Sequence, residues 1–238
     1  MVKLHGFGEM LGLPDPSPFV LKVAHYLRMI AVPYEPCPGN PRKAPRGKLP
    51  YIEDGSQVVA DSSLIVDYLR KKYQDLDAGL LPQDRALSTA VRALLEEHFY
   101  FLMVAQRWKE DRGFRVLAPG FTALMKKTGM PGFLVPVVAS LARKQIVSTL
   151  HAQGTGRHSP QQIEALGIGA LESVSVLLGD KPFFLGDAPR SIDATVFAFL
   201  WLVLGTPYEN EVQAFAQKQS NLVAYTERNR TRYWSDWK

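Results

Sequence analysis

The sequence predicts a small α/β domain followed by an all-helical domain, and two observations lead to this prediction. Residues 1–75 alternate strand-like and helix-like segments, in the order strand, helix, strand, connector, two strands and helix. This order is typical of a small mixed sheet that carries helices on its faces. Residues 76–84 are polar with glycine and proline, as in a linker, and residues 85–238 show helical periodicity without a convincing strand.

The first domain begins with a predicted strand, helix and strand. The segment "VKLHGF" (2–7) has the character of a strand. Residues 17–31 place apolar side chains at helical spacing, with Ser17 as the expected N-cap and Pro18 suited to the first helical position. Residues 33–38 are predicted to form a short strand. Residues 39–46, which are basic and rich in proline, are predicted to form a loop or a short irregular helix.

The first domain ends with a predicted β-hairpin and a helix. The runs "YIE" and "QVVA" flank an Asp54-Gly55 turn, which is a hairpin signal. Pro50 cannot donate a ladder hydrogen bond and therefore suits the first residue of a strand. Whether the bond before it is cis or trans is open. The segment "SSLIVDYLRKKY" is predicted to be a helix with Ser62 as its N-cap.

The second domain is predicted to consist of helices. Residues 87–105 repeat apolar side chains with a 3.6-residue period, which predicts one long amphipathic helix with His98 as a core histidine. A second helix is expected at 133–152. A serine cap, proline and N3 glutamine at 159–162 mark another helix start, and that helix is expected to stop at Gly179. The last two predicted helices are "SIDATVFAFLWLVL" and "SNLVAYTERNRTRYW".

Composition and charge favour a soluble globular protein. Of the 238 residues, 46% are hydrophobic and 21% are charged, which is ordinary for a folded domain. The net charge is +5, and residues 107–157 hold nine Lys or Arg against two acids. No nucleic-acid-reading motif accompanies this basic segment. A solvated face, or an entrance for anionic ligands, is therefore favoured over nucleic-acid binding.

Cysteine content and hydropathy indicate in which cellular compartment the protein is expected. A single cysteine, Cys37, leaves no internal disulfide, redox pair or cysteine-rich zinc site, and fits a reducing compartment. His151 and His158 flank a glycine turn, but no further ligands accompany them, so no metal site is predicted. The N-terminus has no signal-peptide core, and the apolar run 194–204 is about half of a spanning length. We therefore expect no membrane span.

Three places could bind a ligand, and each has a purely structural alternative. Ser17 lies at a predicted helix N-terminus, where an anion is favoured, although spacing alone favours a simple cap. Asp61 and Ser62 lie at another helix N-terminus, where they are suited either to an ammonium and a carboxylate or to capping. Lys48 and the basic loop before it could bind a second carboxylate of the ligand, or they could simply be charged residues in contact with solvent.

The order of these segments resembles the cytosolic glutathione transferase superfamily. The resemblance rests on "SPFVLKVAHYLRMIAVPYE", "GKLPYIEDG" and "ADSSLIVDYL", followed by a linker and a helical domain, and it covers nearly the whole chain. The segment "KPFFLGDAPRSIDATVFAFL" is similar to the stretch that enters the family's central buried helix. The segments "GRHSPQQI" and "NLVAYTERNRTRYW" most resemble the failed-axon-connections and metaxin-like branch, bacterial members included.

The resemblance implies a thioredoxin-like first domain that binds reduced glutathione as a substrate. Ser17 matches the catalytic residue that contacts the glutathione sulfur. Pro50 matches the family's cis-proline, and the Leu49 backbone would pair with the cysteinyl moiety. A serine at position 17, in place of cysteine, favours thiolate addition over thiol-disulfide exchange. The implied glutathione-binding residues are Phe19, Lys48, Leu49, Pro50, Asp61 and Ser62.

The resemblance also assigns the two ends of glutathione, and the chain departs from the pattern in two places. Asp61 and Ser62 would hold the γ-glutamyl end, and Lys48 the glycine carboxylate. The family often has glutamate where Asp61 stands, so the carboxylate here has a shorter reach. Arg190 stands where the family usually places a serine or threonine cap, three residues before Asp193. The capping box is therefore incomplete, and the central helix needs either another cap or another register.

Two functions follow from the resemblance. The first is a transferase that conjugates glutathione to a small, mostly apolar electrophile, bound beside the first long helix by Tyr100, Trp108 and Phe114. The alternative is a non-catalytic binding or interaction module on the same fold. The family further implies a cytoplasmic location and a homodimer. Glutathione is then a substrate, no metal or nucleic acid takes part, and the identity of the electrophile is open.

Overall fold

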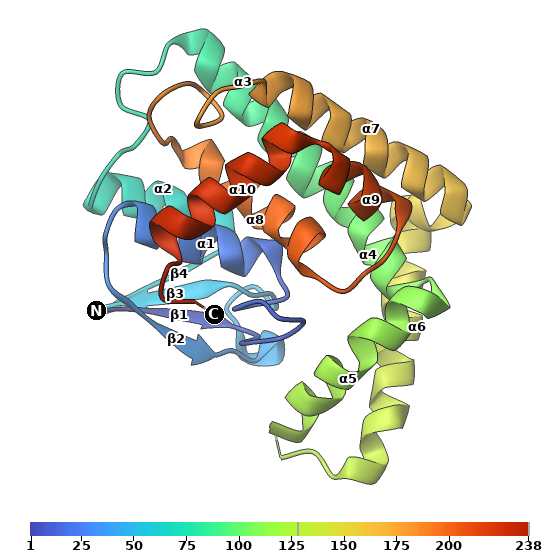
Figure 1. The fold of residues 1–238 in the computed structure, drawn as a ribbon. Coiled ribbons are helices and arrows are strands. Elements are labelled where there is room, and N and C mark those ends of the chain that lie inside the picture. The colour runs from blue at the N-terminus through green and yellow to red at the C-terminus, as the bar shows by residue number, and fades with distance from the viewer. Residues whose placement is uncertain (128, 238) are drawn as a thin grey trace.

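The computed structural model describes residues 1–127 and 129–237, and it has the predicted fold class (Figure 1). A four-stranded mixed sheet forms the first part, with strand order β2-β1-β3-β4. β1 (Val2–Gly6) pairs in parallel with β2 (Tyr34–Pro38) and antiparallel with β3 (Tyr51–Asp54). β4 (Gln57–Ala60) completes the predicted hairpin with β3. The predicted strands are therefore confirmed.

Two helices lie between the sheet and the helical part of the chain (Figure 1). These are α1 (Pro18–Met29), with Ser17 as its N-cap, and α2 (Ser62–Lys72). The connector contains a short 3₁₀ turn, η1 (Pro41–Lys43). The N-cap predicted for α2 was wrong by one residue. Asp61 Oδ1 accepts from the N–H groups of the second and third helical residues, at 3.0 and 3.3 Å, while Ser62 is buried as the first helical residue.

The predicted helix at 87–105 is divided into three pieces. α3 (Pro82–Ala93) continues into a π-helical segment, η2 (Leu94–Phe99), and then into α4 (Tyr100–Trp108). The prediction that His98 is a core residue was wrong, because its side chain is exposed. A π-helix closes i→i+5 hydrogen bonds and so holds more residues per turn. Residues after η2 are therefore rotated relative to a continuous α-helix, and Phe99 is buried in place of His98.

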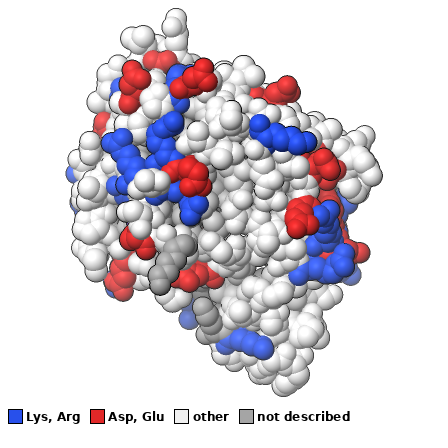
Figure 2. Space-filling view, in the orientation of Figure 1, with Lys and Arg blue, Asp and Glu red and all other residues white. Residues whose placement is uncertain are grey.

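A helical hairpin, here called the arm, projects away from the rest of the molecule (Figure 1). It consists of α5 (Asp111–Lys127), η3 (Gly132–Leu134) and α6 (Val135–Gln153), and the short turn η4 (Thr155–Arg157) follows it. The helix at 133–152 was predicted, whereas α5, which contains Pro119, was not. Figure 2 shows the arm as largely uncharged surface. Phe133, Val137 and Leu141 are exposed on it.

One segment of the arm meets the length and composition expected of a membrane span. It is the stretch Gly132–Gln153, of 22 residues. Only 17% of its most apolar window is buried in the structure. A single such helix is weak evidence for a span, because helices of soluble proteins meet the same criteria. Its sequence alone did not mark this segment as a span.

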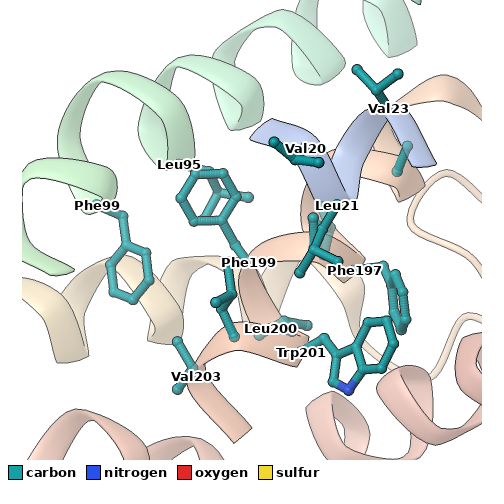
Figure 3. Packing of buried hydrophobic residues seen from close by; sticks show 14 of the residues in the cluster. Val20, Leu21, Val23, Leu95, Phe99, Phe197, Phe199, Leu200, Trp201 and Val203 are labelled. Atoms are coloured by element: carbon teal, nitrogen blue, oxygen red, sulfur yellow. The ribbon is translucent and has the colours of Figure 1, made fainter. Parts of the chain in front are cut away.

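The remaining helices enclose one long buried helix. They are α7 (Pro160–Leu178), α8 (Ser191–Gly205), α9 (Glu211–Lys218) and α10 (Ser220–Tyr233). α7 begins with the predicted capping box and ends at Gly179, as expected. α8 is the central helix, and almost all of its side chains are buried. Figure 3 shows its Phe197 and Phe199 packed among residues of α1 and of the α3–α4 region, which joins both parts of the chain in one core.

The central helix has the alternative cap that its sequence required. Asp193 Oδ1 accepts from the Phe184 N–H at 2.8 Å and from the Tyr225 hydroxyl at 2.7 Å, and its Oδ2 accepts from the Arg190 N–H at 2.8 Å. The backbone N–H of Ser191 donates to Asp77 Oδ1 at 2.8 Å. Asp77 lies in the segment 76–84. A carboxylate from that segment therefore accepts from the first N–H of the central helix, which has no partner within the helix.

Candidate active site

Ser17 lies where α1 begins, on the side of the sheet that faces the helical part. Its Oγ accepts a hydrogen bond from the Val20 N–H at 3.4 Å, so the residue caps the helix as predicted. A hydroxyl oxygen that accepts a hydrogen bond still has its own proton to donate. The N-terminus of α1 also carries a partial positive charge. The position can therefore stabilise an anion by one O–H donor and by the helix dipole.

Asp15, which the sequence analysis did not select, fixes the loop that carries Ser17. Its Oδ2 accepts from the N–H groups of Phe7 at 2.7 Å and Gly8 at 3.0 Å, and its Oδ1 accepts from the Ser17 N–H at 2.9 Å. The side chain is 3% exposed. A Cβ at Gly6 would lie 2.5 Å from Asp15 Oδ2, so only glycine fits there. One carboxylate thus ties the end of β1 to the start of α1.

Burial dominates the ionisation of Asp15. Desolvation raises the pKa of its carboxyl group to about 7, and the three backbone N–H donors oppose that rise without cancelling it. The group that anchors Ser17 therefore titrates near neutral pH. Removing its proton adds a negative charge close to the place where a bound anion would lie.

Arg107 connects the helical part to the same loop. It is buried near the end of α4, and its Nη1 donates to the carbonyl of Pro16 at 3.1 Å. The guanidinium group lies over the ring of Tyr208, 5.2 Å from its centroid. Burial lowers the pKa of Arg107, because the charged form is poorly solvated. A cation from the second part of the chain therefore contacts the residue directly before Ser17.

The second candidate feature is the bond between Leu49 and Pro50, which is cis. This is the geometry that the family resemblance implies for Pro50. Both residues are buried, and Pro50 directly precedes β3. Lys48, the residue before them, is exposed. Leu49 also packs close to Gly39, where an added Cβ would lie 2.6 Å from a Leu49 methyl group.

The third candidate feature is the turn of Asp61 and Ser62, which has a buried ion pair behind it. Asp61 is exposed and adopts a positive φ of 85°. Behind it, Lys22 Nζ lies 3.5 Å from Ser62 Oγ, 3.0 Å from Ser63 Oγ and 2.6 Å from Glu96 Oε1. The serines of this turn are thus held by an ammonium group from α1, which was not foreseen from the sequence.

Glu96 completes this network from the π-helical segment η2. Its Oε1 accepts from Thr195 of α8 at 3.2 Å, and its Oε2 accepts from Ser63 at 3.4 Å. Desolvation lowers the pKa of Lys22, and the adjacent Glu96 carboxylate opposes that shift. With α1, α2, η2 and α8 all contributing, the network joins the two parts of the chain directly behind the turn.

The aromatic residues predicted for a second substrate fall into two separate contacts. Tyr100 packs edge-on against Phe19, with ring centroids 4.8 Å apart. Trp108 packs against Phe114 at 5.9 Å and against Phe121 at 5.6 Å. The first pair lies at the interface between α1 and α4. The second lies where α4 meets the arm, so the structure divides the predicted set.

Within residues 1–127 and 129–237, no group of three or more His, Cys, Asp or Glu side chains is placed to hold a metal ion. Cys37 is a free cysteine, and burial raises the pKa of its thiol. The polar groups gathered near the start of α1 are instead a hydroxyl, a carboxylate and backbone N–H donors. They suit the binding of an organic anion.

Comparison with known proteins identifies the family of this arrangement. Residues 18–113 match the model of the glutathione S-transferase N-terminal domain, and residues 167–229 match that of the glutathione S-transferase C-terminal domain. The chain is 35% identical to an isoprene-epoxide–glutathione S-transferase of Rhodococcus sp. (strain AD45), over 98% of this chain and 99% of that protein.

Other relatives lie in a second group of proteins. The chain is 30% identical to Failed axon connections of Drosophila melanogaster over its whole length, which spans 59% of that protein. It is 26% identical to Metaxin-2 of Mus musculus, over 97% of this chain and 87% of that protein. Among solved structures, a beta-etherase from Sphingobium sp. strain SYK-6 matches with a TM-score of 0.63 at 17% identity, covering 96% of this chain and 94% of that one.

Proposed function

The chain belongs to the glutathione S-transferase family, and from this premise we propose that it conjugates reduced glutathione to a small apolar epoxide. The 35% identity to an isoprene-epoxide–glutathione S-transferase, over almost the full length of both chains, carries the choice of electrophile. Ser17 at the start of α1 carries the choice of chemistry, because it places a hydroxyl donor at a helix N-terminus.

In the proposed reaction, the glutathione thiolate attacks a carbon of the epoxide ring. A carbon–sulfur bond forms as the carbon–oxygen bond of the ring breaks, and the resulting alkoxide takes a proton from water to give a hydroxyl. The Ser17 hydroxyl donates a hydrogen bond to the thiolate and keeps its own proton, and this bond lowers the free energy of the ionised sulfur. Asp15 holds the backbone N–H of Ser17, and Arg107 holds the carbonyl of Pro16, so the hydroxyl is kept in place.

Glutathione would lie along the edge formed by the start of α1, the cis Leu49–Pro50 bond and the Asp61–Ser62 turn. The exposed Asp61 carboxylate is suited to the γ-glutamyl ammonium group, and Ser62 to its carboxylate. The backbone of Leu49 is suited to the cysteinyl moiety, and the exposed Lys48 to the glycine carboxylate. The electrophile would bind near Phe19 and Tyr100, whose rings are in contact at the interface between α1 and α4.

The test of this function is Ser17→Ala in a conjugation assay with glutathione and isoprene monoxide. A hydrogen bond to a charged group contributes about 1.5–3 kcal/mol. We therefore expect kcat/KM to fall about 10- to 150-fold, since each 1.36 kcal/mol is a factor of ten. Glutathione affinity, measured by calorimetry, should change far less. Ser56→Ala, in the exposed hairpin turn, is the matched control. Unchanged turnover in Ser17→Ala contradicts the role of Ser17, and the absence of turnover with any epoxide contradicts the function.

The second candidate is a non-catalytic binding or interaction module. The similarity to Failed axon connections and to Metaxin-2 favours it, together with the basic segment 107–157. Glutathione distinguishes the two, because a ligand that binds the folded state raises the unfolding midpoint. A rise in Tm at millimolar glutathione is expected of the transferase, and no rise is expected of the module. A cytoplasmic location and a homodimer, which the family resemblance implies, are likewise proposed. Sedimentation of the purified chain tests the homodimer.

A further inference from the structure

A second candidate binding site lies in the helical part of the chain. It is a cavity of about 270 Å³ between the end of α4, the start of α5 and the loop that joins α8 to α9. Its walls come from residues 106–116 and 207–210, so residues 1–75 contribute none of them. The volume is just below the range of about 300–1,000 Å³ that is usual for small-molecule sites. The cavity therefore suits a compact ligand, and its walls do not include Ser17, Pro50 or Asp61.

Three buried polar atoms in the walls of this cavity have no hydrogen-bond partner among the described residues. They are the side-chain amide nitrogen of Gln106, Oε1 of Glu110 and the hydroxyl of Tyr208. Gln106 and Tyr208 are each 8% exposed. A buried polar group without a partner costs about 1–3 kcal/mol. Three such atoms around one cavity indicate that its occupant supplies their hydrogen bonds.

The charged residues of the cavity walls indicate the charge of the ligand that would bind there. Glu110 is a carboxylate whose Oε1 is buried, and desolvation together with the neighbouring Glu164 raises its pKa. A bound ammonium group would remove that penalty. Arg112 and Glu209, 3.5 Å apart with exposed side chains, pair with each other, and the charges of Lys109 and Arg112 only partly oppose the rise in the pKa of Glu110. Gln106 is a donor and needs an acceptor on the ligand.

We propose that this cavity binds a small primary amine that also carries a hydroxyl or carboxylate group, as an amino alcohol or amino acid does. The ammonium group lies against Glu110, and the ligand oxygen accepts from the Gln106 amide and the Tyr208 hydroxyl. The apolar part of the ligand packs on Val116 and Pro207. The walls of this cavity include none of the glutathione-binding residues, although Tyr208 contacts Arg107, and the proposal does not rest on the proposed transferase activity.

The experiment is calorimetry of the full chain with phenylalaninol, compared with 3-phenyl-1,2-propanediol, in which a hydroxyl replaces the amine. Saturable binding of one phenylalaninol per chain is expected, with the diol at least tenfold weaker. Saturating glutathione should change the phenylalaninol Kd by less than twofold. No saturable binding means that the cavity holds water only and overturns the proposal. Equal binding of the two compounds, or displacement by glutathione, overturns it as well.

Two variants locate the binding in the cavity. Glu110→Gln removes the charge while keeping the size, and it should weaken phenylalaninol at least tenfold. Glu172→Gln, on the exposed face of α7, is the matched control and should bind as the wild type does. Val116→Trp fills the cavity from the surface of α5 and should abolish binding while circular dichroism stays native. Unchanged binding in a folded Glu110→Gln or Val116→Trp chain contradicts the site.

Discussion

The setting of Ser17 depends on a carboxylate two residues before it. Asp15 accepts three backbone N–H bonds, and these hold the end of β1 and the first residue of the α1 cap in one geometry. The same carboxylate is almost fully buried, and its pKa is raised to about 7. Asp15 therefore combines a structural role with an ionisation near neutral pH.

We predict that Asp15 makes stability depend on pH. The folded-state pKa is raised above the ordinary value of 3.8, so the folded state favours the protonated carboxyl group. Its contribution is fully present below pH 3.8 and is lost as the pH rises toward about 7. The unfolding free energy of the wild type minus that of Asp15→Asn should therefore fall over this interval. Urea denaturation across the interval measures it, with the exposed Asp187→Asn as control.

A constant difference between wild type and Asp15→Asn from pH 4 to pH 7 would contradict the raised pKa of Asp15. A difference that rises with pH would contradict its sign. That result would mean that the three N–H donors outweigh desolvation, as they do for many carboxylates at helix N-termini.

Local signals made some site residues predictable from the sequence and left others hidden. Ser17 and Pro50 are marked by their immediate neighbours, as a helix cap and as a strand-start proline. Lys22 and Arg107 have no such mark, because their partners are distant along the chain. Lys22 meets Glu96 at a sequence separation of 74, and Arg107 meets Pro16 at a separation of 91. A charged residue on the buried face of a helix is the one clue that the sequence offered.

The π-helical segment η2 determines which side chains of the longest helical run face the core. Hydrophobic periodicity predicted the run correctly but assumed a constant 3.6 residues per turn, which misplaced His98. The phase change also turns Glu96 inward, where it meets Lys22 of α1. π-bulges are frequent at functional sites. Here the irregular turn supplies the carboxylate behind the Asp61–Ser62 turn.

We predict that the ion pair of Lys22 and Glu96 joins α1 to η2 more strongly than a surface pair would. Removal of one partner leaves a buried charge without compensation and costs about 3–5 kcal/mol. Lys22→Met and Glu96→Gln should each lower the unfolding free energy by that order. The double variant Lys22→Met, Glu96→Gln should lose clearly less than the sum of the two. Denaturant titrations of the four chains give the coupling.

The exposed pair of Arg230 and Glu227 is the control for these variants, because pairs of that kind contribute only about 0–1 kcal/mol. Additive losses in the double variant would contradict the coupling. A Lys22→Met chain as stable as the wild type would contradict the idea that burial makes this pair important.

Other elements were predicted where their signals are local. The capping box at Ser159 and the stop at Gly179 gave the bounds of α7, and continuous apolar character gave α8. α5 was missed, because Pro119 lies inside it and interrupts the pattern. A proline in a helix interior removes a hydrogen bond and normally ends the helix. In the arm, packing against α6 and α4 retains the helical conformation around it.

Residues that follow α10 pack against α1, near the start of the chain. Trp234 Nε1 donates to His25 Nδ1 at 2.9 Å, and the Arg28 guanidinium lies 4.0 Å from the centroid of the Trp234 ring. Arg28 also pairs with Asp236 at 2.6 Å. Burial lowers the pKa of His25 to about 3, so its ring is neutral and can accept from the indole. Residues after α10 therefore stabilise α1, although more than 200 positions separate them.

We predict that the contacts between Trp234 and α1 are required for the stability of the whole molecule. Trp234→Ala removes a side chain that is 3% exposed and packs against Trp201 with centroids 4.9 Å apart. Replacement of a buried tryptophan by alanine costs about 3–5 kcal/mol. The midpoint of thermal unfolding, followed by circular dichroism, should fall accordingly. Phe133→Ala, where the side chain is 79% exposed on the arm, should stay within about 0.5 kcal/mol of the wild type.

The burial of Lys22 has a consequence for chemical labelling. Lys22 is 2% exposed and its amine is bound by Glu96 and Ser63, whereas Lys43 and Lys48 on the neighbouring connector are exposed. An acylating reagent applied briefly to the native protein should modify the connector lysines and spare Lys22. Peptide mapping by mass spectrometry then gives the rate at which Lys22 is modified. Because the reagent reaches Lys22 only when the interface between α1 and η2 opens, this rate reports how often the interface opens.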